Sequence, residues 1–316
     1  MEISQLIHYI AVASPIVFAA IGTGVGQGLA GFGALESLVR HNLGKDQSFR
    51  AMIIGLALTE SALVIALVVT IMTLFSGYSQ ITWPIALAEL GMGFSIGSAA
   101  LFASIASSFA VKSACVSITR QPFSDQKIMT LMLLIQSLIE AALVFAFIVA
   151  LFIRNGISVE LGFYDGAKLL AAGIAMGLGC IGPLIGQAIF ANKACFAVGL
   201  NSNAYQKVLP YSLLSEAAIE TPLVFSLLVS LLVLYFPLSS TNSFLSLVSF
   251  FTAAITIGLG ALGGLASGLV SSKGCVQVAL SPEIYPPVLR STLLTQAFIE
   301  SSVIYALIVA LFLLIR

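Results

Sequence analysis

Long apolar stretches separated by short polar breaks dominate the hydropathy pattern of this chain. A helix needs about 20 residues to cross the hydrocarbon core of a bilayer, and eight stretches reach that length. A spanning segment must satisfy its own backbone hydrogen bonds, so the pattern predicts helices rather than irregular chain. The predicted fold class is therefore an all-α membrane protein with eight transmembrane helices. They are expected over residues 6–39, 51–75, 85–118, 128–153, 167–199, 208–236, 244–280 and 288–314.

An internal repeat groups these helices into pairs. Glu60, Glu140, Glu220 and Glu300 follow one another at equal intervals, each inside the second helix of a pair, and this common interval defines a repeat frame. Because every repeat holds an even number of spans, all copies enter the membrane from the same side, unlike the inverted repeats of many transporters. The chain is thus predicted to be four tandem helical hairpins. Their expected boundaries are 1–80, 81–160, 161–240 and 241–316.

Composition agrees with a membrane location and excludes one class of partner. Hydrophobic residues make up 59% of the chain and charged residues only 8%, whereas about a quarter of the residues of a soluble domain are charged. Thirteen basic and thirteen acidic residues cancel. A chain without excess positive charge lacks the electrostatic footprint of a nucleic-acid-binding protein, so nucleic acid is excluded as a main partner.

The distribution of the cations predicts the orientation in the membrane. Most Lys and Arg residues lie in or beside the first, third, fifth and seventh polar breaks. By the positive-inside rule these loops face the cytoplasm, and both termini face the opposite side. The loops expected on the cytoplasmic side cover residues 40–50, 120–127, 200–207 and 281–287.

The four repeated glutamates are the candidate functional groups. A carboxylate at mid-membrane costs about 2.5 to 3.5 kcal/mol on insertion scales, and such residues usually mark ion pathways. No Lys or Arg lies at matching depth in any repeat, which disfavours a structural ion pair. A carboxyl in this place rests either protonated or with a bound cation. We therefore interpret Glu60, Glu140, Glu220 and Glu300 as ion carriers.

Polar side chains accompany the glutamates in the same repeat frame. A hydroxyl or amide beside a buried carboxyl can be an ordinary helix-packing contact, but the register favours a coordination shell. Glu216, four residues before Glu220, is either a second titrating group or a helix-end polar contact. The candidate ligands are Gln27, Ser107, Gln187 and Ser267 on the first helices and Ser61, Thr221 and Ser301 directly after the glutamates.

Small residues form a stripe along the first helix of each hairpin, beginning with Gly22, Gly24, Gly26 and Gly28. Small residues let helix backbones approach closely in a membrane. The stripe therefore predicts a tightly packed inner layer. A dinucleotide loop is a poor alternative because no strand precedes these glycines.

Together these residues resemble the c subunit, the ring-forming proteolipid of F-type ATP synthases, and the resemblance covers the whole chain as four fused copies. Residues 22–31 look like the glycine-rich inner helix of that family, running on to Arg40. Arg120, Gln121 and Pro122 reproduce its Arg-Gln-Pro loop, which in the family touches the central stalk. The other three loops depart from that motif.

The resemblance implies a concentric two-layer rotor ring with the four glutamates as the ion-binding carboxylates. It also implies a non-catalytic subunit without a cofactor, in an energy-coupling membrane such as a bacterial inner membrane. The implied partners are membrane lipid, the a subunit of the stator, the gamma and epsilon subunits of the central stalk, and further copies of the chain. A ring made only of this chain holds a multiple of four hairpins, and about three chains are expected.

The identity of the ion and the type of complex leave alternatives open. The transported ion is predicted to be H⁺, with Na⁺ at the same glutamates as the alternative. The sodium-type ligand set that the resemblance implies is present in the first repeat and in the third, as Gln27, Glu60, Ser61 and as Gln187, Glu220, Thr221. The second repeat, with Ser107 and Ala141, is poorest in oxygens and favours the proton. Vacuolar-type proteolipids are also fused hairpins, but many of their copies lose the carboxylate. A stand-alone transporter using the carboxylates as a relay is the alternative from a different class.

Overall fold

The computed structural model of the chain describes residues 2–40, 44–78, 80–238 and 242–315. Within these ranges it contains eight helical spans long and apolar enough to cross a membrane, and no strand. The predicted fold class is confirmed. Five spans are single α-helices: α1 (Glu2–Arg40), α4 (Trp83–Arg120), α5 (Asp125–Gly156), α8 (Tyr205–Tyr235) and α11 (Tyr285–Ile315).

The other three spans each contain a local break that the hydropathy pattern does not predict. Between α6 and α7 the break falls at Cys180, three residues before Pro183, which has no N–H to donate to the preceding turn. Hydrogen bonds on both sides of Cys180 continue the helix axis. The interrupted spans are α2 (Lys45–Thr59) with α3 (Ser61–Leu74), α6 (Phe163–Gly179) with α7 (Ile181–Leu200), and α9 (Ser243–Gly260) with α10 (Gly263–Leu280).

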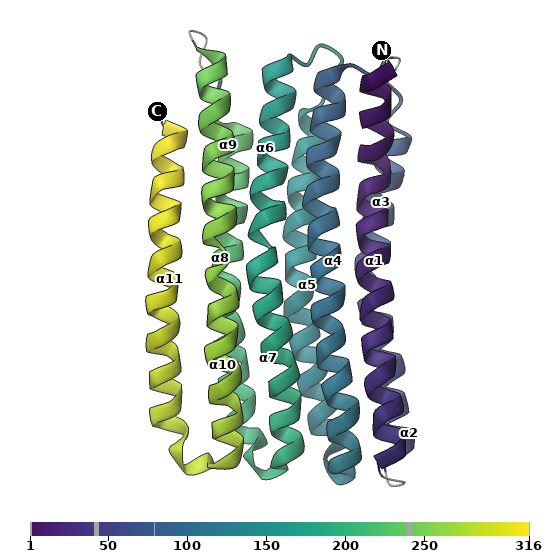
Figure 1. Ribbon diagram of the computed structural model, residues 1–316, viewed down its shortest axis with the longest axis vertical. Helices are drawn as coiled ribbons and strands as arrows, with labels where there is room; N and C mark the ends of the chain where they lie inside the picture. The colour runs from purple at the N-terminus through teal and green to yellow at the C-terminus, as the bar shows by residue number, and fades with distance from the viewer. Residues whose placement is uncertain (1, 41–43, 79, 239–241, 316) are drawn as a thin grey trace.

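The helices form two layers (Figure 1). The first helices of the hairpins pack side by side, α1 against α4, α4 against α6 and α7, and α6 and α7 against α9 and α10. The second helices of the first three hairpins lie behind this row, and α11 lies at its edge beside α9 and α10 (Figure 1). Three of the hairpins turn through short 3₁₀ segments, η1 (Pro122–Ser124), η2 (Ser202–Ala204) and η3 (Pro282–Ile284). These turns lie at one end of the molecule, and both termini lie at the other (Figure 1).

Glycine allows the inner helices to approach at backbone distance. A Cβ atom added to Gly173 would overlap the carbonyl oxygen of Gly91, and one added to Gly186 would overlap that of Gly264. Any side chain at these positions would push the helices apart. The stripe of small residues thus allows close packing of the first helices where successive hairpins meet, as its sequence pattern predicts.

The row of hairpins is open at both edges. α1 and α11 lie on opposite sides of the molecule (Figure 1). In the most apolar 18-residue stretch of each span, 72% is buried in α4 and in α6–α7. The corresponding share is 39% in α1 and 33% in α9–α10. Gly24, Gly28 and Gly31 of α1 have no neighbouring atoms within 4 Å of an added Cβ. The end hairpins therefore expose packing surfaces that the central hairpins bury.

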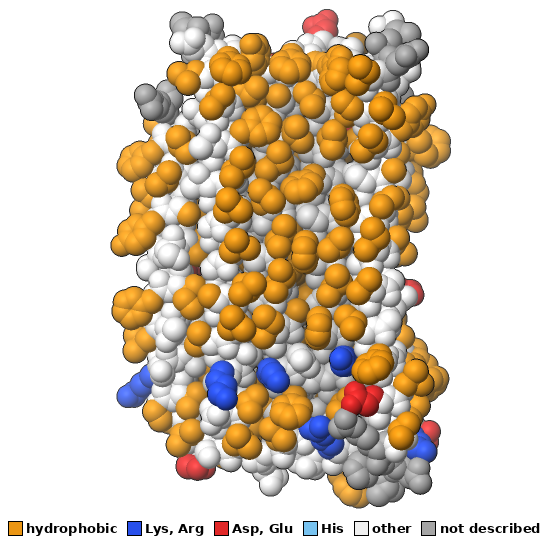
Figure 2. Space-filling view, in the orientation of Figure 1, with side chains coloured by type: hydrophobic (Ala, Val, Ile, Leu, Met, Phe, Trp, Pro, Cys, Tyr) orange, Lys and Arg blue, Asp and Glu red, His pale blue; other side chains and the backbone are white. Residues whose placement is uncertain are grey.

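The surface is apolar along the length of the helices, and basic side chains gather near one end. Figure 2 shows the Lys and Arg residues of this face close to the end that carries the hairpin turns in Figure 1. Their position at one rim, with hydrophobic side chains covering the surface toward the other end, is typical of a protein embedded in a bilayer.

Candidate ion-binding site

The four glutamates lie near the middle of the second helix of each hairpin. The layer formed by these second helices is called the outer layer, and the layer of first helices the inner layer. Glu60 separates α2 from α3, whereas Glu140, Glu220 and Glu300 lie within α5, α8 and α11. Glu60 is exposed in this single chain and the other three are partly exposed. A carboxyl at this depth on the outer surface faces hydrocarbon, which it can do only when its charge is neutralised.

In the first hairpin the predicted amide partner is in place. Gln27 Nε2 on α1 donates a hydrogen bond of 2.9 Å to Glu60 Oε1. The two residues come from the two helices of one hairpin, as the repeat frame predicts. The amide can bind either the carboxylate or, through its oxygen, a cation held by that carboxylate.

In the second hairpin the partner comes from the preceding hairpin. Ser61 Oγ donates a hydrogen bond of 3.0 Å to Glu140 Oε1. The hydroxyl that follows one glutamate thus serves the next glutamate in the row. In the repeat frame the residue that corresponds to Ser61 for Glu220 is Ala141, which carries no hydroxyl.

Two of the predicted hydroxyl ligands bind their own helix. Thr221 Oγ1 donates to the carbonyl of Ala217 and Ser301 Oγ to that of Phe298. In the described part of the chain neither Glu220 nor Glu300 makes a side-chain hydrogen bond.

Ser107 and Ser267 have glutamines as partners rather than the glutamates. Gln136 Nε2 donates to Ser107 Oγ at 2.7 Å and to the carbonyl of Gly55 at 3.1 Å. Gln296 Nε2 donates to Ser267 Oγ at 2.8 Å and to the carbonyl of Ser215 at 3.2 Å. These glutamines lie four residues before Glu140 and Glu300 and join the second hairpin to the first and the fourth to the third.

The third hairpin departs from the others. Gln187 and Glu216 are both buried, with exposed fractions of 1% and 0%. The amide of Gln187 interacts with the carboxyl of Glu216, although no polar atom of either side chain has a hydrogen bond of normal geometry. Gln187 therefore faces Glu216 and leaves Glu220 without the amide that Gln27 supplies to Glu60.

The predicted stalk-facing residues lie at the turn end of the molecule. Arg120 ends α4, and its guanidinium lies 5.0 Å from the centre of the Phe196 ring. Gln121 follows, and Pro122 begins η1. Phe123, next in the chain, is fully exposed. Arg40 ends α1, and the next three residues of its loop lie outside the described part of the chain.

Sequence reasoning missed a buried histidine–glutamate contact between the first two hairpins. His8 Nδ1 of α1 lies 2.5 Å from Glu89 Oε2 of α4. Both side chains are at least nine-tenths buried. The two residues occupy nearly the same position in successive repeats. That correspondence is the signal that could have shown the pair, since aligned positions of successive inner helices lie side by side.

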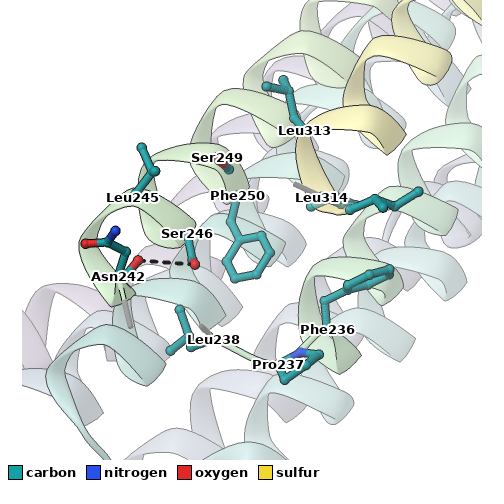
Figure 3. A pocket seen from close by; sticks show the side chains of 11 residues that line it. Phe236, Pro237, Leu238, Asn242, Leu245, Ser246, Ser249, Phe250, Leu313 and Leu314 are labelled. Carbon is teal, nitrogen blue, oxygen red and sulfur yellow. Dashed lines mark hydrogen bonds between the residues drawn. The ribbon is translucent and has the colours of Figure 1, made fainter. Parts of the chain in front are cut away.

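The described residues contain no cluster of metal-ligating side chains, and the cavity in Figure 3 lies away from the glutamate sites. Among the described residues no three His, Cys, Asp or Glu side chains form a potential metal centre. The cavity, of about 510 Å³, lies between the end of α8, the start of α9 and the end of α11, where Phe250 and Leu314 line it (Figure 3). Its first residue on α11, Leu313, lies about 20 Å of helix beyond Glu300.

Comparison with known proteins shows that each of the four repeats is similar to one family of membrane proteins. The sequence model of the family described as the ATP synthase C subunit matches four segments, residues 10–73, 90–153, 170–233 and 251–313. The ATP synthase c subunit of Dehalococcoides mccartyi is 41% identical over 71 residues, which are 22% of this chain and 93% of that protein. The ATP synthase c subunits of Syntrophobacter fumaroxidans and Thermosynechococcus vestitus are 39% and 40% identical over 74 residues, 23% of this chain and 82% and 90% of theirs.

Proposed function

The chain belongs to the ATP synthase c subunit family, and we propose that it is the proton-carrying rotor subunit of a rotary F-type ATP synthase. Membership in the family implies assembly into a ring within the synthase complex. The observation that carries the proposal is the placement of one glutamate per hairpin in the outer layer, without a Lys or Arg partner among its hydrogen-bonding and ionic contacts in the described residues. The F-type assignment is favoured over a vacuolar-type proteolipid because all four hairpins keep the carboxylate.

The four glutamates carry the ion by alternating between a neutral and a charged form. A neutral carboxylic acid can pass through lipid, whereas a bare carboxylate there costs several kcal/mol. A glutamate that reaches a positively charged group on the a subunit of the stator releases its proton, because the opposite charge stabilises the anion. Moving one charge across 100 mV yields about 2.3 kcal/mol, so several carriers must act for each ATP.

The site with the fewest ligands favours H⁺ over Na⁺. Every glutamate of a ring must pass the same stator, so all of them must carry the same ion. Glu220 has Ala141 in the hydroxyl register and lacks a hydrogen bond to Gln187. A dehydrated cation needs several oxygen ligands, whereas a proton needs one acceptor. The pair of Gln27 and Glu60 is the observation that favours Na⁺, and it is confined to one hairpin.

The surrounding assembly follows from the same proposal. The open edges of the row accept further copies of the chain, about three in all. The turns with Arg120, Gln121 and Pro122 face the gamma and epsilon subunits on the cytoplasmic side. The chain itself is non-catalytic and binds no cofactor other than the transported ion. We expect it in a bacterial inner membrane with its termini on the far side.

We predict that ATP hydrolysis by the complex that contains this chain acidifies vesicles in the absence of sodium. The complex is purified, inserted into lipid vesicles in sodium-free buffer and given ATP, and internal pH is followed with a fluorescent dye. A protonophore should abolish the signal, and added sodium should change the initial rate by less than about twofold. Sodium-dependent pumping that resists the protonophore would instead assign Na⁺, and transport by the chain without the ATPase head would support a stand-alone transporter.

A further inference from the structure

In two of the four hairpins the residue four positions before the membrane glutamate is a hydrogen-bond donor, whereas the first hairpin has Leu56 there. In the second and fourth hairpins Gln136 and Gln296 occupy this position, and each Nε2 donates to a serine of the inner helix and to a backbone carbonyl of the preceding hairpin. In the third hairpin the same position holds Glu216. A carboxylate cannot donate, so an ionised Glu216 would not suit its place in the repeat.

Among the described residues, no positively charged group acts on the carboxyl of Glu216. The groups that face its carboxyl among the described residues are Gln187 and Cys195 from α7 and Glu220 from its own helix. The Glu216 side chain is fully buried, and both of its oxygens lack a hydrogen bond of normal geometry in the described structure. A buried carboxylate without a partner is costly. Its one neighbour of matching chemistry in this part of the chain is the amide of Gln187, which is also buried and unsatisfied.

We propose that Glu216 holds an additional, resident proton and forms a neutral acid–amide pair with Gln187, while Glu220 exchanges its own proton with the stator. The acid supplies one O–H donor and one carbonyl acceptor, and the amide supplies an N–H donor and a carbonyl acceptor. A small rotation of either side chain then satisfies the polar atoms that are now without partners. The inference rests on the proposed function, because it assigns Glu216 a role distinct from the exchanging site.

This pair determines which ion the third hairpin can carry. In the first hairpin Gln27 is free to donate to Glu60, whereas Gln187 is engaged by Glu216. With Ala141 in the hydroxyl register, Glu220 is left without either of the oxygen donors that a cation would need. Glu216 thus acts as a specificity-determining residue that makes the third site selective for protons.

The test uses infrared spectroscopy of the purified ring. The carbonyl stretching band of a protonated carboxylic acid is followed as pH rises, and carbodiimide labelling of Glu220 is measured on the same samples. We expect one acid band to persist at a pH at which labelling of Glu220 has ceased, and to be lost in the variant Glu216→Gln. Loss of that band together with Glu220 labelling would show an exchanging acid, and its loss on addition of sodium would show a cation site. Either result overturns the proposal.

Paired variants keep the test informative if Glu216→Gln alone folds poorly. The double variant Glu216→Gln/Gln187→Ser reproduces the glutamine–serine pair of the second and fourth hairpins. It should recover most of the thermal stability lost by Gln187→Ser alone, since the lone serine leaves the acid without its amide. If the double variant is less stable than Gln187→Ser, the two residues are not a pair. Absence of labelling at all four exchanging glutamates would count against the proposed function. Normal labelling without a persistent acid band that depends on Glu216 would count only against the resident proton.

Discussion

Replacement of Glu140 by glutamine should stop ATP synthesis by the complex, with a loss of at least about a hundredfold. Glutamine has nearly the same volume as glutamic acid but cannot release a proton. Ser61 can still donate to the amide oxygen, so the helix packing around position 140 should persist. Because each chain of the ring carries the variant, every turn of the rotor meets several sites that cannot exchange. Glu60→Gln, Glu220→Gln and Glu300→Gln should behave alike.

The measurement compares ATP synthesis driven by an imposed pH gradient in vesicles with the wild-type and variant complexes. The matched control is Glu160→Gln, which makes the same chemical change at an exposed glutamate between the second and third hairpins. That control should retain synthesis within about twofold. Substantial synthesis by Glu140→Gln in a complex that assembles normally would mean that Glu140 is not a carrier.

A valine at position 28 should leave the single chain folded but weaken assembly of the ring. An added Cβ on Gly28 meets no atom of its own chain. Its counterpart in the fourth hairpin, Gly268, lies against the backbone of Gly186 in the preceding hairpin. The repeat frame therefore places Gly28 against Ala266 of another copy. Overpacking costs typically about 1–3 kcal/mol at each such contact, which weakens each junction between chains by roughly five- to more than a hundredfold.

The comparison variant Gly268→Val places the same clash inside one chain. It should lower the thermal stability of the isolated chain and speed its proteolysis. Gly28→Val should change the free energy of unfolding of the isolated chain by no more than about 1 kcal/mol and leave its proteolysis unchanged. Size-exclusion chromatography and native mass spectrometry of the purified protein report the assembled fraction. Normal ring formation by Gly28→Val would contradict the placement of α1 at a junction between chains.

Much of the fold could be predicted because the membrane imposes few solutions. Eight apolar stretches had to be helices, and the regular recurrence of glutamate along the chain was enough to define the hairpins. The breaks at Glu60 and Cys180 could not be predicted from hydropathy, since it does not register local hydrogen bonding. The pair of His8 and Glu89 was also missed, because each residue alone looks like an isolated polar group near the end of a span.

The sites were harder to predict because their partners come from neighbouring hairpins. The repeat frame brought Gln27 to Glu60, as expected. It did not show that Ser61 serves Glu140 rather than its own neighbour Glu60, which depends on the packing of one hairpin against the next. For the same reason, the hydrogen bond from Gln136 to Ser107 could not be predicted from the position of the serine in the repeat.

Carbodiimide labelling tests most directly whether one glutamate per hairpin binds and releases a proton. The reagent modifies protonated carboxyls that it can reach, and mass spectrometry identifies each modified residue of the purified ring. We expect labelling at Glu60, Glu140, Glu220 and Glu300 that declines as pH rises and is unaffected by sodium at fixed pH. Protection of these four residues by sodium would replace the proton with Na⁺, and absence of labelling at all four would contradict the assignment of these glutamates as carriers.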